Sequence, residues 1–155
     1  MRTFIGIDPG KKGGIAVIRD DVAVAYKIRD TLGDNRDLFE QISEYSNSFC
    51  LIEDVHAMPG NSPNSMFSFG KNFGMLLTFL SSNYIAFETV TPQVWQKEFG
   101  LLTSQLKETT GKREFTKTEK KRCHYEKAQE LFPHIKMTHA LADALLIAEF
   151  NRRNA

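Results

Sequence analysis

IGIDPGKKGGIAVI, residues 5–18, is the stretch of sequence that decides the fold. Ile5, Gly6 and Ile7 are typical of a strand that ends at Asp8, and Pro9-Gly10 then breaks the chain. The second half of the stretch has the β-branched composition of another strand. A carboxylate at such a bend is typical either of a solubilising turn or of a metal or phosphate site at the end of a central strand. The rest of the chain has to decide between these two interpretations.

Working outward from this stretch, the sequence predicts five strands and five helices. The strands are expected at residues 3–8, 13–20, 22–28, 49–54 and 84–90, and the helices at 34–48, 66–80, 91–100, 117–133 and 138–153. The Pro, Gly and Asn content of HAMPGNSPNS, residues 56–65, predicts a loop, and the polar segment 101–116 shows no clear element. Three consecutive strands followed by two strands between helices predict an α/β fold. Its five-stranded mixed sheet would have three antiparallel strands and then two parallel ones, with helices on its faces.

Composition and charge limit the class of protein. With 155 residues, 41% of them hydrophobic and 25% charged, we expect one globular domain spanning 1–155. The net charge is only +1, but residues 107–127 hold eight Lys or Arg against four Glu, an excess typical of a nucleic-acid footprint. The two cysteines suggest neither a disulfide scaffold nor a Cys-based zinc site. No signal peptide or membrane span is evident, so we expect a cytoplasmic protein with no membrane partner.

Three acids lie where the predicted elements would bring them together. Asp8 ends the first strand, Glu53 ends the strand at 49–54, and Asp143 lies inside the otherwise apolar helix segment LADALLIA. Carboxylates gathered without cations repel one another, and a hard cation such as Mg²⁺ or Mn²⁺ relieves that repulsion. His139, one helical turn before Asp143, is either a further ligand, a proton carrier or an ordinary residue at the start of a helix. Taken alone, Asp8 and Glu53 are also typical of exposed acids at strand ends, whereas Asp143 is harder to explain in that way.

Six motifs in order carry a family resemblance: IGIDPGKKGGIAVI, LIEDVHAMPG, MFSFGKNFG, VTPQVWQKEFG, EKAQELFP and HALADALLIAEF. From about Ile5 to Phe150 the chain resembles the RuvC-type Holliday junction resolvases, and most closely their phage-like branch. The resemblance implies an RNase H-like nuclease fold and a homodimer that cuts four-way branched DNA symmetrically. It implies Mg²⁺ or Mn²⁺, two ions per active site, and the cytoplasm of a host cell if a phage encodes the protein.

The resemblance also implies roles for the acidic residues. Asp8 matches the first-strand aspartate of the family, Glu53 the glutamate of its IE motif, and Asp143 the aspartate of its ADA motif. Asp8 would bridge both ions, while Glu53 and Asp143 would each hold one side. His139 stands where relatives carry a further Asp or His, as a ligand or a proton carrier. Many cellular members have an Asp at the position that Ala140 occupies here, so the fourth ligand departs from the family pattern.

By its spacing to EKAQELFP, Lys121 matches a lysine that the family places near the scissile phosphate. Lys117 and Lys120 lie close enough in the sequence to be alternatives for that role. The basic helix 117–133 is expected to follow DNA phosphates, although a charged helix face is also typical of plain solvation. Residues of the loop after Glu53 would lie at the junction centre, where they could wedge between bases. The residues expected to contact DNA are Lys117, Lys120, Lys121, Arg122, His56 and Met58.

The helix at 66–80 is the expected dimer interface. It carries more apolar surface than one face of a sheet can cover, and Gly70 and Gly74 would let a partner helix approach closely. Coverage by another helix of the same chain is the alternative. A two-fold dimer would supply the two active sites that symmetric cutting requires.

Three other functions compete with a junction resolvase. IGIDPGKKGG also resembles the first phosphate-binding turn of actin-like sugar kinases, but those chains are much longer and contain a second such turn. A non-catalytic junction-binding protein with the same fold would not need Asp8, Glu53 and Asp143. A nuclease for flaps or replication intermediates is nearer still, and the sequence alone does not separate it from a resolvase.

Overall fold

A mixed sheet forms the centre of the protein. The computed structural model describes residues 1–56 and 59–155. Within these residues five strands lie in the order β3-β2-β1-β4-β5. β1, β2 and β3 are antiparallel, whereas β4 is parallel to β1 and β5 to β4, so the predicted mixed sheet is confirmed. The strands are β1 (Thr3–Asp8), β2 (Gly14–Arg19), β3 (Val22–Lys27), β4 (Ser48–Glu53) and β5 (Ala86–Val90).

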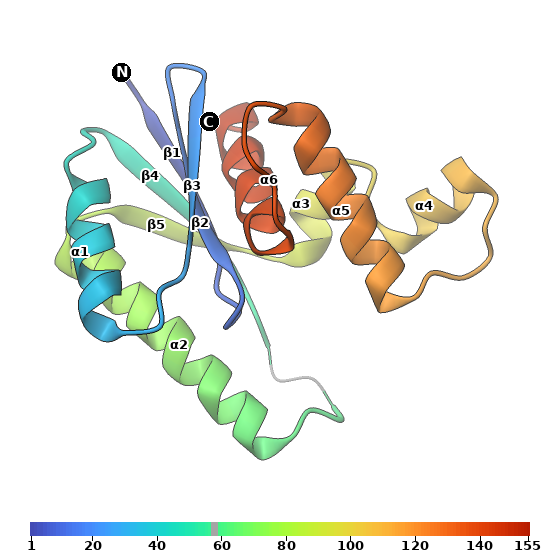
Figure 1. Ribbon diagram of the computed structural model, residues 1–155, viewed down its shortest axis with the longest axis horizontal. Coiled ribbons are helices and arrows are strands. Elements are labelled where there is room, and N and C mark those ends of the chain that lie inside the picture. The colour runs from blue at the N-terminus through green and yellow to red at the C-terminus, as the bar shows by residue number, and fades with distance from the viewer. Residues whose placement is uncertain (57–58) are drawn as a thin grey trace.

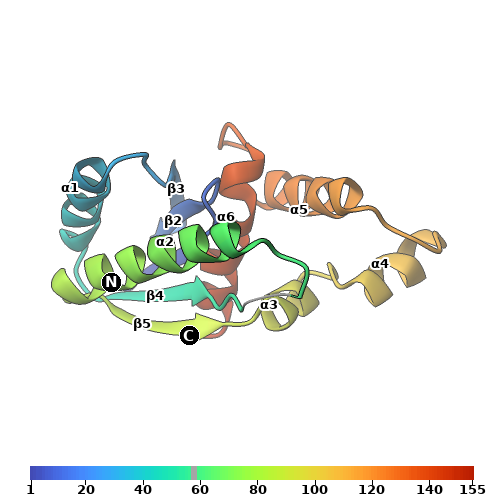
Figure 2. The same cartoon turned by 90° about the horizontal axis from the view of Figure 1, so that it is seen from below.

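Helices cover both faces of this sheet, which gives three layers (Figures 1 and 2). α1 and α2 lie on one face, and α6 lies on the other with α3 and α5 beside it (Figure 1). α4 lies at the far end of the molecule from α1 (Figure 2). The helices are α1 (Leu32–Ser43), α2 (Pro63–Ser82), α3 (Pro92–Glu98), α4 (Thr103–Thr110), α5 (Lys117–Leu131) and α6 (His139–Arg153). No helix in the described part of the chain is both long and apolar enough to span a bilayer.

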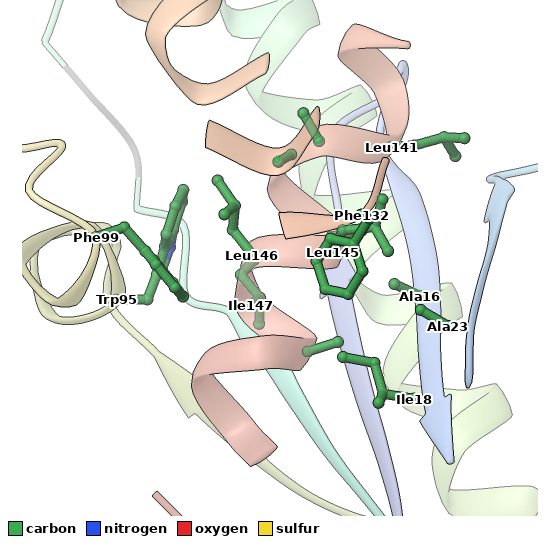
Figure 3. Close-up of a cluster of buried hydrophobic side chains, with 14 of the residues drawn as sticks. Ala16, Ile18, Ala23, Trp95, Phe99, Phe132, Leu141, Leu145, Leu146 and Ile147 are labelled. Carbon is green, nitrogen blue, oxygen red and sulfur yellow. The ribbon is translucent and has the colours of Figure 1, made fainter. Parts of the chain in front are cut away.

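Each face of the sheet has its own hydrophobic core. Because side chains alternate along a strand, Ile5 and Ile7 of β1 pack toward α1 and α2, while Gly6 lies under α6. The core on the α6 face includes Trp95 of α3 and Leu145 of α6, as Figure 3 shows. β1 is therefore buried on both sides, which makes its end a well-fixed position for a functional group.

Three local expectations were wrong. The helix expected at 34–48 ends at Ser43, and Ser48 already begins β4. Segment 101–116 contains the helix α4, whose Leu106 is buried in the core and whose end is set by Gly111 at φ 72°. Residues 63–65, expected to be loop, form the first turn of α2. Pro63 suits that position because it lacks only an N–H that the first turn leaves unpaired, and Ser62 caps the helix by accepting a hydrogen bond from the backbone N–H of Ser65.

Candidate active site

The ends of two neighbouring strands place Asp8 beside Glu53. β1 and β4 are parallel, and Ile7 is paired with Ile52, so the next residue of each strand lies at the same sheet edge. The same alternation that sends Ile7 and Ile52 into the α1–α2 core turns the two acids toward the α6 face. The first and fourth strands are thus neighbours in the sheet, and this pairing brings two carboxylates together.

The third carboxylate, Asp143, is brought to the same place by close packing of α6 on β1. A Cβ atom on Gly6 would collide with the backbone of Ala144 and Ala148, so only glycine lets α6 approach the strand this closely. Asp143 precedes Ala144 in α6 and lies near enough to Asp8 and Glu53 to perturb the pKa of both. The structure therefore brings together the three acids that the sequence singled out.

Burial and mutual repulsion make two of these acids unusually weak. Burial, then the charge of Asp143, raises the pKa of Asp8 from 3.8 to about 6, against the opposing effects of the Gly10 N–H, Lys121 and His124. Burial, then the charge of Asp8, raises the pKa of Glu53 from 4.5 to about 8. Burial and repulsion between the acids thus outweigh the nearby positive charges, and a cation bound among the acids would stabilise their ionised forms.

Two side chains that the sequence analysis did not assign hold two of the acids by hydrogen bonds. The indole N–H of Trp95, which is fully buried, donates to Oε2 of Glu53 at 2.7 Å. Nδ1 of His124 lies 2.7 Å from Oδ1 of Asp143, and its ring meets the Trp95 ring edge-on with 5.4 Å between centroids. The available sequence signals were the position of Trp95 inside the VTPQVWQKEFG motif and the three-residue spacing of His124 from Lys121. Neither signal names the acid that each residue contacts.

An open cavity of about 740 Å³ is lined by two of the three acids, Asp8 and Asp143, but not by Glu53, and by only one of the α5 residues expected to contact DNA. Asp8, Lys121, His124 and Asp143 line it together. Lys121 is near enough to Asp8 to lower its pKa. The other basic residues expected to contact DNA, Lys117, Lys120 and Arg122, are not among the residues that line this cavity.

The two histidines that the sequence analysis assigned to the site, His139 and His56, lie in different places. His139 lines the cavity but is exposed, and its ring lies 5.1 Å from that of Tyr125. His56 is also exposed, with Nε2 at 3.2 Å from Oδ2 of Asp54. Met58, the other expected wedge residue, lies outside the described residues. Asp143 thus has His124, and not His139, as its hydrogen-bond partner among the side chains that the structure describes.

The donor set suits a hard divalent cation that also binds water and phosphate. Among residues 1–56 and 59–155, no group of three or more His, Cys, Asp or Glu side chains is arranged to hold a metal ion by itself. Mg²⁺ usually keeps several waters and takes one or two carboxylates, with substrate phosphates supplying the rest. Carboxylates from β1, β4 and α6, of which Asp143 raises the pKa of Asp8 and both Asp8 and Asp143 raise that of Glu53, fit that mode of binding.

Comparison with known proteins supports the fold. No protein-family model matches the sequence, and no curated protein matches it. A solved structure of T. thermophilus RuvC in complex with Holliday junction substrate matches with a TM-score of 0.56 and 12% identity, over 100% of this chain and 97% of that one. A Thermus thermophilus RuvC structure matches with a TM-score of 0.54 and 15% identity, over 98% of this chain and 96% of that one. The chain therefore has the RuvC type of RNase H-like fold.

Proposed function

We propose that this protein is a metal-dependent, structure-specific endonuclease that resolves four-way DNA junctions by symmetric phosphodiester hydrolysis. One observation carries the proposal: three acids from β1, β4 and α6 lie within electrostatic reach of one another at the sheet edge of a RuvC-type fold. A structural or purely binding role gives no reason to keep Asp8 and Glu53 in surroundings that raise their pKa. The six motifs of the sequence support the phage-like branch of resolvases, acting in the host cytoplasm.

In this proposal Asp8, Glu53 and Asp143 hold Mg²⁺ or Mn²⁺, two ions per active site. The bound ions supply an activated water and charge stabilisation for the leaving oxygen. Asp8 comes from the central strand β1 and would hold both ions, while Glu53 and Asp143 would each hold one. Trp95 and His124 each occupy one oxygen of an acid and leave the other oxygen to face a cation.

Lys121 and His139 supply the remaining chemistry at the mouth of the cavity. The ammonium of Lys121 would stabilise charge on the phosphate in the transition state, since it lies on the cavity wall near Asp8. His139, exposed one helical turn before Asp143, is placed to act as a proton carrier for the leaving oxygen or as a ligand. Lys117, Lys120 and Arg122 extend the positive charge of Lys121 along α5 and would contact phosphates further from the cut.

A homodimer through α2 completes the proposal. Phe67 is 74% exposed. A Cβ atom added to Gly70 or Gly74 would meet no neighbouring atom within 4 Å. Among the described residues, then, no second helix of the same chain covers this part of α2. A partner helix laid across the two glycines would bury Phe67 and bring two active sites to one junction.

The direct test is incubation of a labelled four-way junction with the protein, with Mg²⁺, with Mn²⁺ and with EDTA. We expect paired nicks at symmetric positions with either ion, and binding without cleavage in EDTA. Asp8→Asn, Glu53→Gln and Asp143→Asn should each abolish cleavage and keep binding, whereas the control Asp20→Asn, in the β2–β3 turn, should keep both cleavage and binding. Binding without cleavage under any divalent ion would favour a junction-binding protein, and cleavage of flaps alone would favour the other class of nuclease.

A further inference from the structure

Four basic side chains line the wall of the cavity that the sheet contributes, and the sequence analysis assigned a role to none of them. They are Lys11 and Lys12 in the β1–β2 turn, Lys27 at the end of β3, and Arg29 two residues later, and together they are called the basic rim below. All four are exposed. Lys121 of α5 also lines this cavity, and α5 lies on the other side of α6 from β3 (Figure 1). The cavity therefore has positive charge on two separate walls.

The backbone fixes the rim next to the acids. The N–H of Gly13 donates to the Gly10 carbonyl at 2.8 Å, which closes the β1–β2 turn, and the N–H of Ile28 donates to the Gly13 carbonyl at 3.2 Å. A Cβ atom on Gly13 would collide with the carbonyl of Asp8, so the turn packs directly against the end of β1. The turn and the end of β3 thus form one platform that adjoins Asp8.

The rim charges are not neutralised by ion pairs. In the described part of the chain, no carboxylate oxygen lies within 4 Å of a rim nitrogen in any ion pair. Two acids share this wall, Asp30 and Asp34, and Asp34 is engaged at the start of α1, where its carboxylate accepts a hydrogen bond from the Thr31 hydroxyl. The wall keeps an excess of positive charge beside a group of partly buried acids, which is the arrangement expected where a polyanion must be held against carboxylates.

We propose that the basic rim is a second phosphate-binding site for nucleic acid, which holds the backbone of the cleaved strand on the side of the scissile phosphate opposite to α5. The inference rests on the proposed function and specifies how that site holds its substrate. The strand would cross the N-terminal end of α6, with one flank on the rim and the other on Lys121 and the rest of α5. Exposed lysine and arginine side chains free of acidic partners are the groups that make such sequence-independent contacts.

The first test measures junction binding in EDTA, where cleavage is absent, over a range of salt concentrations. The variants are Lys11→Gln/Lys12→Gln and Lys27→Gln/Arg29→Gln. Each lost phosphate contact should reduce the slope of log K against log salt by about 0.9 on duplex DNA, which corresponds to about fivefold in affinity at 0.15 M salt and about 30-fold for a pair. The matched control is Arg2→Gln/Arg19→Gln, the same change in charge at the opposite end of β1 and β2.

The second test locates the contact. Single methylphosphonates, which lack the phosphate charge, are placed on either side of the cut. In wild type they should weaken binding on both sides, whereas the rim variants should lose sensitivity on one side only and a Lys117→Gln/Lys120→Gln variant on the other. Rim variants with wild-type affinity and salt slope, or with unchanged sensitivity on both sides, would overturn the inference while leaving the nuclease assignment intact. A wild-type protein that binds no DNA would overturn both.

Discussion

Replacing Asp8 with Asn should stabilise the metal-free protein at neutral and alkaline pH. The folded state raises the pKa of Asp8 from 3.8 to about 6, so it holds the proton more tightly than the unfolded chain does. The unfolding free energy of the wild type therefore falls as the pH rises from about 4 to about 6. Glu53, with its pKa raised from 4.5 to about 8, extends that fall toward pH 8. Asn is nearly the same shape and keeps an oxygen to accept the Gly10 N–H bond, yet it carries no charge.

The size of the effect follows from the pKa. A rise of roughly two pH units for Asp8 corresponds to about 3 kcal/mol of lost stability once the group is ionised. Asp8→Asn should recover that amount above pH 6 and somewhat more near pH 8, since the charge of Asp8 also raises the pKa of Glu53. Below pH 4 the variant and the wild type should have equal stability. The acids with lowered pKa, Glu119 and Glu149, act in the opposite direction at the acid end of the range and are unchanged between the two proteins.

Urea unfolding between pH 4 and pH 8.5, in EDTA, measures this directly. Asp20→Asn is the control, because Asp20 is exposed at φ 50° in a turn that asparagine adopts equally well. Added Mg²⁺ or Mn²⁺ should then stabilise the wild type at pH 8 by the linkage RT ln(1 + [L]/Kd), and should stabilise Asp8→Asn far less. An Asp8→Asn variant less stable than wild type at pH 8, or a wild type whose stability rises between pH 4.5 and 7.5, would refute the electrostatic account of the site.

Three further substitutions test other parts of the site and the dimer. Trp95→Phe removes the N–H donor to Glu53, a bond to a charged group worth about 1.5–3 kcal/mol, so metal affinity measured by isothermal titration should fall about 10-fold or more. His124→Ala frees Asp143 and should reduce the cleavage rate at saturating junction without weakening junction binding, whereas His124→Asn, which can still donate to Asp143, should recover part of the rate. Gly74→Leu should give a monomer in sedimentation that binds one arm weakly and cuts poorly. Paired symmetric cutting by that monomer would contradict the dimer.

The sequence was sufficient for the mixed sheet and for singling out the three acids, because strand patterns and the setting of each acid can be read locally, whereas the order of the strands came from the structure. Alternation within β1 and β4 sets which face each acid occupies, and the apolar surroundings of Asp143 mark it as unusual. The partners of the acids could not be predicted, since Trp95 lies 42 residues from Glu53 and His124 lies 19 residues from Asp143 along the chain. Such contacts depend on how α3 and α5 pack against α6, and no pattern within either helix encodes that packing.

The basic rim escaped the sequence analysis for a related reason. Its four charges come in two separate pairs, one in a turn and one at the end of a strand. A count of charges along the chain therefore detects the basic run that includes α5 but not the rim. The pairing of Gly14 with Lys27 in the sheet, together with the hydrogen bond between Ile28 and Gly13, brings the two pairs of rim residues into one wall. The glycines of the first motif explain why that wall adjoins the acids: Gly6 lets α6 approach β1, and Gly13 lets the turn fold back on Asp8. The stretch that decides the fold therefore also sets the spacing between the acids and the charges of the basic rim beside them.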